Sequence, residues 1–352
     1  MQCLVKYLKW PFYSTLNSII MKNIYILLLL ISSLFSCDKV YFGEDLGTKD
    51  RKKNFEYLWN ECNEKYSYFD VKNIDWDAIK VKYESQINEG MSDEAFFNVM
   101  GSMLSELKDD HTNLISPLNV SRFGVKKLGQ DNFDFRVIED NYLSDNYYIS
   151  GPFMHDFIAN NEIGYIRFGE FTGTVDDNNL DFILKRYKNT KGLILDLREN
   201  GGGAVNDIFS ILSRFVEKKT LVYYSRIKTG AAHDDFSEMK EAFVEPSGKI
   251  RYKNKVIVLI DRGTYSAGSF TALATKALPN ITLIGDTTGG GLGMPNGGQL
   301  PNGWTYRFSI TQALDLSKDP SLEKGVPADI PVSFDWSDMK KDEILDRAIN
   351  EL

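Results

Sequence analysis

Two segments of the sequence place chemically competent residues directly after apolar runs. Residues 196–203 read Asp-Leu-Arg-Glu-Asn-Gly-Gly-Gly, and residues 261–269 end in Ser-Ala-Gly-Ser, beginning at Ser266. Consecutive glycines permit backbone angles that expose N–H groups, which suits the binding of an oxyanion. A serine at a helix start can act as a nucleophile, because neighbouring amides stabilise negative charge. Taken singly, the first segment favours a flexible strand-to-helix turn, and Ser266 favours a helix N-cap.

The elements that must position these residues alternate between strand and helix patterns. Short apolar runs typical of buried strands lie at residues 163–168, 192–197, 255–260 and 281–284. Helical periodicity occupies the intervals between them, at residues 180–187, 205–215 and 267–278. This alternation predicts an α/β core over residues 163–352. Residues 220–250 are interpreted as an excursion between core elements.

An N-terminal helical domain is predicted over residues 51–117. Its apolar side chains recur at helical spacing and are interpreted as core: Phe55, Leu58, Trp59, Cys62 and Tyr66, then Phe96, Met100, Met103 and Leu107. Cys62 is therefore expected to be a small buried hydrophobe, not a nucleophile. Residues 118–162, rich in Asp, Asn and Tyr, are predicted to be a β-containing connector with long loops.

Taken together, the two segments resemble the tail-specific (C-terminal processing) serine proteases. The motifs that carry the resemblance are Asp-Leu-Arg-x-Asn-x-Gly-Gly at 196–203, Ser-Ala-Gly-Ser at 266–269, Gly-Asp-Thr-Thr-Gly-Gly at 285–290, Gly-Val-Pro-Ala-Asp at 325–329 and Leu-Lys-Asp-Asp-His-Thr at 107–112. The resemblance covers roughly residues 50–335. It implies a crotonase-like (ClpP-like) α/β spiral protease core behind an N-terminal helical bundle, with Ser266 as the nucleophile. The connector lacks a Gly-Leu-Gly-Phe-like loop, so a full PDZ domain is not expected.

The resemblance also bears on the general base. The Lys-dependent branch of the family places its lysine where this sequence has Gly291, which disfavours a Ser-Lys pair. The chain is more similar to the catalytic core of tricorn protease, which implies His111 as the base, because a neutral imidazole can take and return a proton near pH 7. The other two histidines, His155 and His233, lie in polar segments that match no motif and are predicted to be surface residues.

Four backbone N–H groups and two carboxylates complete the expected site. The resemblance implies an oxyanion hole formed by Gly201, Gly202, Gly203 and Ala267. It also implies a carboxylate that orients the imidazole, for which Glu323 and Asp110 both remain candidates. No metal or organic cofactor is implied.

The resulting hypothesis is a serine endopeptidase that cleaves exported or unfolded polypeptides through an acyl-enzyme. Two other functions use the same residues or fold. The first is a non-catalytic protein that binds a peptide or a lipid in the cleft, since fold alone does not fix function. The second is an esterase with the same Ser-His pair.

The first residues of the chain indicate export. The apolar run at residues 24–31 is too short to span a bilayer and follows Lys22, so residues 1–36 are predicted to be a signal peptide, with Met21 the natural start. Residues 34–37 resemble a bacterial lipoprotein cleavage box, which implies acylation of Cys37 and a tether to about residue 50. A plain secretory signal or an inner-membrane anchor is the alternative. The expected location is periplasmic or on the cell surface.

Composition restricts the partners. The chain has 41 basic and 49 acidic residues, a formal net charge of −8 and no Lys/Arg-rich block, which argues against nucleic acid as the main partner. Three Cys and three His are too few for a disulfide framework or a multi-ligand zinc site. The expected partners are a polypeptide substrate and, through the lipid anchor, a membrane; the sequence gives no oligomeric state.

Overall fold

A seven-stranded mixed sheet organises the computed structural model, which describes residues 47–352. The predicted signal peptide and Cys37 lie outside the described residues. The strand order is β13-β9-β8-β5-β4-β3-β2. The five strands from β13 to β4 are parallel to one another, and β3 is antiparallel to both of its neighbours, β4 and β2. The bounds are β2 (Tyr148–Ser150), β3 (Phe153–Ile158), β4 (Ile163–Phe168), β5 (Gly192–Asp196), β8 (Lys255–Ile260), β9 (Ile281–Gly285) and β13 (Ile330–Pro331). The α/β prediction is confirmed.

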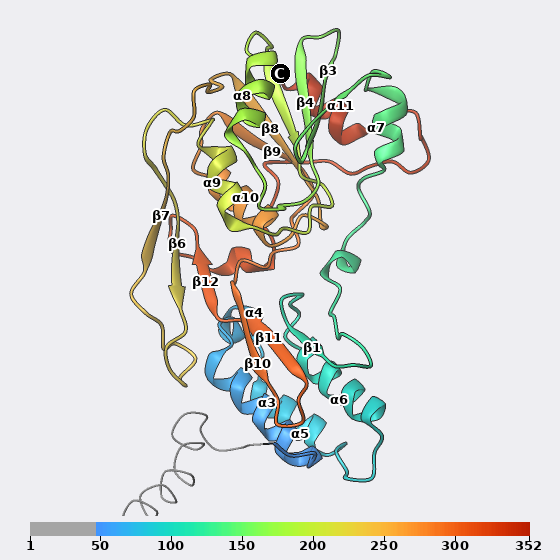
Figure 1. Ribbon diagram of the computed structural model, residues 1–352, viewed down its shortest axis with the longest axis vertical. Helices are drawn as coiled ribbons and strands as arrows, with labels where there is room; N and C mark the ends of the chain where they lie inside the picture. Colours follow the sequence, from blue (N-terminus) through green and yellow to red (C-terminus); the bar gives the residue numbers. More distant parts are fainter. Residues whose placement is uncertain (1–46) are drawn as a thin grey trace, which may run out of the picture. The chain divides into compact units, whose positions relative to one another are not determined.

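Helices cover both faces of this sheet (Figure 1). One face carries α8 (Asp177–Arg186), α9 (Val205–Leu212) and α10 (Ala267–Thr275), and the other carries α7 (Phe135–Asn141) and α11 (Glu343–Asn350). In β5, Leu193 and Leu195 pack on the first face and Ile194 on the second. Burial on both faces explains why the central strands are continuous apolar runs in the sequence.

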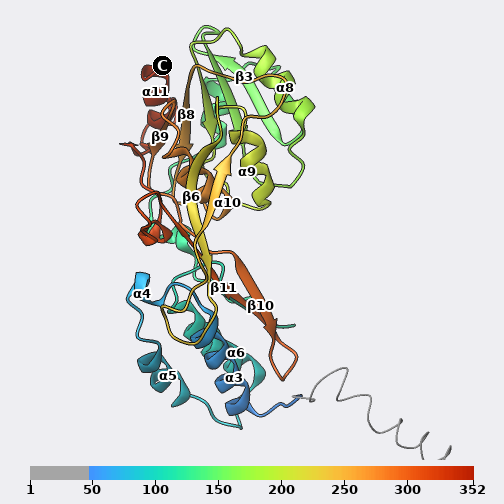
Figure 2. The ribbon, with the colours of Figure 1, turned by 90° about the vertical axis from the view of Figure 1, so that its left-hand side faces the viewer.

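The N-terminal helices pack against a hairpin from the other end of the chain. They are α3 (Arg51–Lys65), α4 (Phe69–Lys72), α5 (Trp76–Glu84) and α6 (Asp93–Ser105). Their apolar stripes, Cys62 included, are buried as predicted and enclose Trp304 and Tyr306. Tyr306 belongs to β11 (Thr305–Ser309), which pairs with β1 (Asn113–Ile115) and β10 (Pro295–Gln299) (Figures 1 and 2). The residues next to His111 are therefore hydrogen-bonded to a strand near the C-terminus.

A third sheet occupies most of the predicted excursion. Its order is β12-β6-β7, with β6 (Thr220–Ile227), β7 (Lys240–Val244) and β12 (Thr311–Leu314). Two short 3-10 helices, η1 (Val125–Leu128) and η2 (Ser321–Lys324), flank the site described below. In the connector predicted at 118–162, β2 and β3 are strands of the main sheet. Across residues 47–352 the structure has no helix that combines the length and apolar character needed to cross a membrane.

Candidate active site

The turns that follow β5, β8 and β9 build the site. These strands are parallel neighbours, so their carboxyl ends meet at one edge of the sheet, where α/β proteins place their ligands. The amide of Tyr265 donates to the carbonyl of Asn200 at 2.9 Å, and the amide of Ser266 donates to that of Gly290 at 3.0 Å. The turn after β8 is thus held from both sides by the turns after β5 and β9.

Ser266 occupies the N-cap position of α10, yet its side chain does not cap the helix. Its backbone has φ 54° and ψ −119°, a conformation that is costly for a residue with a Cβ and that concentrates at functional sites. Its Oγ lies 3.0 Å from Nε2 of His111, which is 155 residues away in the sequence. The interpretation of Ser266 as an ordinary N-cap therefore does not account for its geometry.

His111 is 7% exposed, and its surroundings favour the neutral imidazole that a general base requires. Burial lowers the pKa of its imidazole, Asp109 raises it and Arg307 lowers it, with a net lowering from 6.5. The ring is therefore neutral at pH 7, and Nε2 can accept the proton of Ser266. Among the described residues Nδ1 has no hydrogen-bond partner of normal geometry, although the backbone of Gly293 lies close enough to favour the protonated ring.

The two carboxylates expected to orient the imidazole do not contact it. Asp110 accepts the backbone N–H groups of Gly124 at 2.6 Å and Val125 at 2.7 Å, so it anchors the loop that leads into η1. Glu323 accepts the N–H of Leu292 at 2.6 Å with one oxygen, and its other oxygen faces Lys72. This corrects the expectation that either carboxylate holds the ring directly, because both have other partners.

Asp109 is the carboxylate that positions His111, through the backbone. Its Oδ1 accepts the N–H of His111 at 2.8 Å and the hydroxyl of Tyr265 at 2.9 Å, and its Oδ2 accepts the hydroxyl of Ser309 at 2.9 Å. The Tyr265 ring also packs edge-on against the imidazole, with 4.9 Å between ring centroids. Sequence reasoning missed Asp109. The Asp-Asp-His run was the available signal, but spacing alone does not tell which of two adjacent carboxylates turns inward.

A buried lysine lies between Asp109 and Glu323. The Nζ of Lys72, from α4, is 3.7 Å from Asp109 and 3.0 Å from Glu323. Burial raises the pKa of Asp109, but Lys72 and His111 more than compensate and hold it at about 2. Burial raises the pKa of Glu323 to about 7 although Lys72 opposes the change. One ammonium balances one carboxylate, so Asp109 stays ionised while Glu323 retains its proton until the pH nears neutrality.

The expected oxyanion donors differ in availability. The N–H of Gly202 donates to Oδ1 of Asn200 at 2.9 Å, which removes it from the set and corrects the prediction for this residue. Within the described part of the chain, the N–H groups of Gly201, Gly203 and Ala267 have no acceptor. These three remain candidates to bind an oxyanion.

Gly202 has a packing role instead. Its φ is +96°, and a Cβ at this position would lie 2.7 Å from both Cβ of Ser266 and the carbonyl oxygen of Tyr265, and 2.8 Å from the amide of Ala267. No side chain fits at these distances. The glycine therefore lets the turn after β5 lie directly against the nucleophile's backbone.

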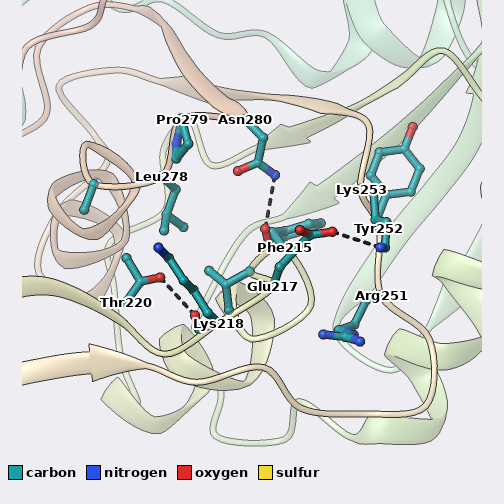
Figure 3. Close-up of a pocket in the computed structure, with 12 residues that line it drawn as sticks. Phe215, Glu217, Lys218, Thr220, Arg251, Tyr252, Lys253, Leu278, Pro279 and Asn280 are labelled. Carbon is teal, nitrogen blue, oxygen red and sulfur yellow. Dashed lines mark hydrogen bonds and ion pairs between the residues drawn. The ribbon is translucent and has the colours of Figure 1, made fainter.

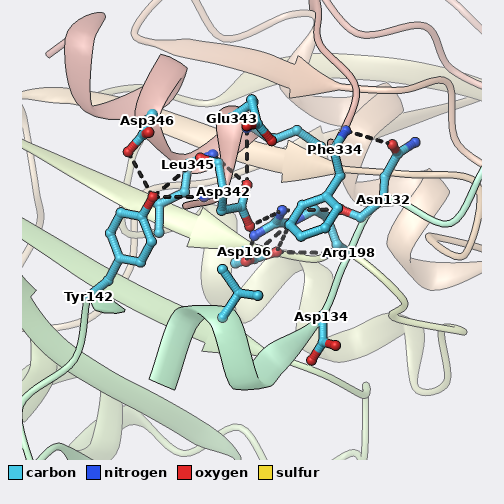
Figure 4. Close-up of polar contacts among 12 residues, drawn as sticks. Asn132, Asp134, Tyr142, Asp196, Arg198, Phe334, Asp342, Glu343, Leu345 and Asp346 are labelled. Atoms are coloured by element: carbon cyan, nitrogen blue, oxygen red, sulfur yellow. Dashed lines mark hydrogen bonds and ion pairs between the residues drawn. The ribbon is translucent and has the colours of Figure 1, made fainter. Parts of the chain in front are cut away.

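The same turn is anchored at its base by buried charges (Figure 4). Arg198 is fully buried; its guanidinium donates to Asp196 at 2.6 Å and to Asp342 at 2.7 Å, as well as to the carbonyl of Asn132 at 3.2 Å. Asp342 is the N-cap of α11. The start of the glycine turn is thus fastened to the C-terminal helix.

A cleft of about 950 Å³ contains Ser266 and His111. A side pocket of about 280 Å³ adjoins it through Val205 and Met294, and is walled by Phe270 one helical turn after the serine. A hollow of about 970 Å³ lies elsewhere, at the end of the sheet where β8 and β9 begin, and holds an ion pair of Glu217 and Lys253 at 2.8 Å (Figure 3). That hollow lacks the Ser-His pair, so its similar size does not make it the reaction site.

The remaining candidates lie outside the site. The surface prediction for His155 is wrong: it is fully buried in β3 between Ser150 and Tyr187, and burial lowers its pKa to about 4. His233 has a side chain 37% exposed and stacks on Phe69. Gly291 has φ +72° and a Cβ there would overlap the Tyr265 ring, so a lysine at that position would strain the backbone and displace this ring.

Between residues 47 and 352, no group of three or more His, Cys, Asp or Glu side chains is arranged to hold a metal ion.

Comparison with known proteins identifies the family. The model of peptidase family S41 matches residues 162–332, and that of the tricorn protease C1 domain matches residues 48–105. A candidate peptidase from Parabacteroides merdae is 37% identical, with a TM-score of 0.82 over 86% of this chain and 97% of its own. Proteins with curated records give no significant match.

Two more distant structures share the fold. Mature CPAF is 12% identical, with a TM-score of 0.64 over 85% of this chain and 95% of its own. The photosystem II D1 C-terminal processing protease is 14% identical, with a TM-score of 0.52 over 81% and 94%. On the identity and coverage of the Parabacteroides merdae relative and the two family models, the chain belongs to peptidase family S41 and is a serine peptidase.

Proposed function

We propose that the protein is an endopeptidase that cleaves exported or unfolded polypeptides, with Ser266 as nucleophile and His111 as general base. The observation that carries the proposal is the 3.0 Å contact between Oγ and Nε2 of this pair, with a base that burial keeps neutral at pH 7. The N–H groups of Gly203 and Ala267, which have no acceptor within residues 47–352, support the same chemistry.

The reaction proceeds through an acyl-enzyme. Ser266 Oγ attacks the scissile carbonyl carbon while its proton moves to Nε2 of His111. Backbone N–H groups of Gly203 and Ala267 stabilise the oxyanion of the tetrahedral intermediate. The imidazolium then protonates the leaving amine, the C–N bond breaks, and water activated by the neutral imidazole hydrolyses the acyl ester. Asp109 keeps His111 in place through its backbone N–H.

A fluorophosphonate probe tests the pair. The wild type is expected to be labelled at Ser266, whereas Ser266→Ala and His111→Ala should each lose at least about 1,000-fold in peptide hydrolysis. Parallel assays on a peptide and a simple ester separate a peptidase from an esterase. A folded wild type that neither reacts with the probe nor cleaves peptides would refute the proposal and favour a binding protein.

We also propose that the protein is an exported lipoprotein held in a membrane by acyl chains on Cys37. The support is the Leu-Phe-Ser-Cys box at residues 34–37 after a short apolar run. Mass spectrometry of the mature N-terminus should find a lipid-modified Cys37, and Cys37→Ala should move the protein from the detergent phase to the aqueous phase. An unmodified N-terminus beginning elsewhere would contradict this assignment.

A further inference from the structure

The hollow of about 970 Å³ lies at the end of the main sheet opposite the Ser-His pair, where β8 and β9 begin (Figure 3). Its floor is apolar, because the buried side chains of Phe215, Val216 and Leu278 reach it from the loops that follow α9 and α10. A volume of this size is typical of ligand-binding sites. The proposed mechanism uses none of these residues.

Two cations without counter-charges line the hollow. Lys218 and Arg251 are exposed, and within residues 47–352 neither side chain has an ion-pair or hydrogen-bond partner. Figure 3 shows them on different sides of the hollow, neither joined to a neighbour. The third cation of the described lining, Lys253, pairs at 2.8 Å with Glu217, which is the one acidic residue of that lining. The hollow therefore has an excess of positive charge, although the chain carries a net −8.

Lys219, which follows Lys218 in the chain, has the partners that Lys218 lacks. Its ammonium pairs with Glu245 at 2.8 Å and lies 4.5 Å from the centroid of the Phe243 ring. None of these three residues lines the hollow. Two adjacent lysines thus differ in whether their charge is available to a ligand.

A smaller pocket of about 260 Å³ continues from the hollow, since Ala277 lines both. Leu316 forms part of its apolar wall and is 49% exposed. The charged groups of this pocket are occupied: Lys276 pairs with Asp329 at 2.6 Å, and Asp315 accepts backbone N–H groups of its own turn. A ligand can therefore place an anionic group in the hollow and an apolar group in the adjoining pocket.

Backbone groups favour a polypeptide as this ligand. Within the described part of the chain, the N–H groups of Glu217 and Lys218 have no acceptor. A peptide supplies carbonyl oxygens for such donors, together with carboxylate and apolar side chains on one backbone. A nucleic acid supplies the negative charge but no aliphatic side chain for the pocket beside Ala277.

We propose that the hollow is a second, non-catalytic site that binds an acidic peptide segment of a partner polypeptide. Its carboxylates bind Lys218 and Arg251 through charge-assisted hydrogen bonds, and an adjacent apolar side chain enters the pocket beside Ala277. The twelve residues from Ser266 to Leu278, mostly α10, span about 18 Å at 1.5 Å per residue. The site is therefore separate from the cleft and independent of the proposed function.

Calorimetric titration of the full chain carrying Ser266→Ala tests the proposal, because this variant lacks the proposed nucleophile. Three peptides, acetylated and amidated at their ends, serve as probes: one Leu flanked by Glu residues, the same peptide with Gln for Glu, and the same peptide with Ser for Leu. The Glu peptide should bind at least about ten-fold more tightly than the Gln peptide, and this advantage should shrink between 50 and 500 mM salt. The Ser peptide should bind several-fold more weakly than the Leu peptide.

Variants of the hollow locate the binding. Combining Lys218→Gln with Arg251→Gln should weaken the Glu peptide about ten-fold or more. Lys219→Gln, which removes the neighbouring but paired lysine, should bind the peptide as before. Leu316→Ser should weaken binding several-fold and keep the preference for Glu over Gln. Thermal melting of each variant establishes that it is folded.

Several results would overturn the site. They are no measurable binding of the Glu peptide, equal affinity for the Glu and Gln peptides, and an equal loss of affinity in Lys219→Gln. An oligothymidylate that binds as tightly as the Glu peptide would replace the peptide site by a general polyanion surface. None of these results bears on peptide hydrolysis, and a wild type that cleaves nothing would leave the binding site in place.

Discussion

The two members of the Ser-His pair are held in place by different means. Ser266 is fixed by backbone: the carbonyls of Asn200 and Gly290 hold its turn, and Gly202 fits against it because it has no side chain. His111 is fixed by buried side chains centred on Asp109. The nucleophile is therefore sensitive to added volume, and the base is sensitive to changes of charge and pH.

The largest effect is expected from Asp109→Asn, which removes the charged group that anchors His111. Removing one charge of a buried ion pair typically costs about 3–5 kcal/mol, and the variant also loses anchoring of the His111 backbone. Urea unfolding and kcat measure the two consequences. Asp110→Asn is the matched control, since that carboxylate pairs with no cation within residues 47–352. An equal loss there would show that Lys72 is not the reason Asp109 matters.

A smaller effect is expected on the pH dependence of folding stability, through the titration of Glu323. Its pKa is raised from 4.5 to about 7 in the folded state, so the folded protein binds more protons and loses stability as the pH rises between these values. At about 1.4 kcal/mol per pKa unit the loss reaches up to about 3 kcal/mol. Glu323→Gln cannot ionise, so the wild-type-minus-variant stability should fall across this range in urea titrations. Glu217→Gln is the control: Lys253 lowers the pKa of this exposed carboxyl, so its difference should not fall as the pH rises. A difference for Glu323 that does not fall either would contradict the assignment.

The third effect is expected from added volume beside the nucleophile, Ser266. Gly202→Ala puts a methyl group within 2.8 Å of Ser266 and Ala267, and should lower kcat about 100-fold by displacing the serine. Gly201→Ala is the matched control, because it keeps the backbone N–H of this residue and a Cβ there meets nothing within 4 Å. Stopped-flow acylation of both variants measures the loss. Equal rates for the two would mean that the close approach at Gly202 does not position Ser266.

The smallest effect is expected from Arg307→Gln, which changes the charge near His111 and leaves Asp109 in place. Arg307 is one of the groups that lower the pKa of His111, after burial. Arg307→Gln should therefore move the acid limb of the kcat/KM profile to higher pH, from a position below 6.5. An uncharged peptide substrate isolates this effect from substrate binding. A limb that moves down would show that the arginine acts on the base by another route.

The parts of the molecule that follow from sequence are those whose signal is local. The strands at 163–168 and 255–260 have the predicted bounds, because burial on both faces leaves an unbroken apolar run. The pairing of Ser266 with His111 was reached through motifs, and the structure brings the two together. His155 was misplaced because β3 mixes polar and apolar residues and gives no clear period.

The supporting charges could not be predicted. Lys72, Asp109 and Glu323 come from three distant parts of the chain, so no spacing relates them. The β10–β11 hairpin was missed for a related reason: its apolar residues pack on the N-terminal helices and not on the predicted core. Long-range partners of this kind depend on the tertiary arrangement that sequence periodicity does not encode.

The pairing of β1 with β11 makes assembly of the site depend on a late part of the chain. The base lies two residues before β1, and its anchor Asp109 is hydrogen-bonded to Ser309, 200 residues further along the chain. Contacts of such sequence separation form late in folding. A chain that emerges amino end first therefore cannot complete the anchor of His111 until Ser309 is available.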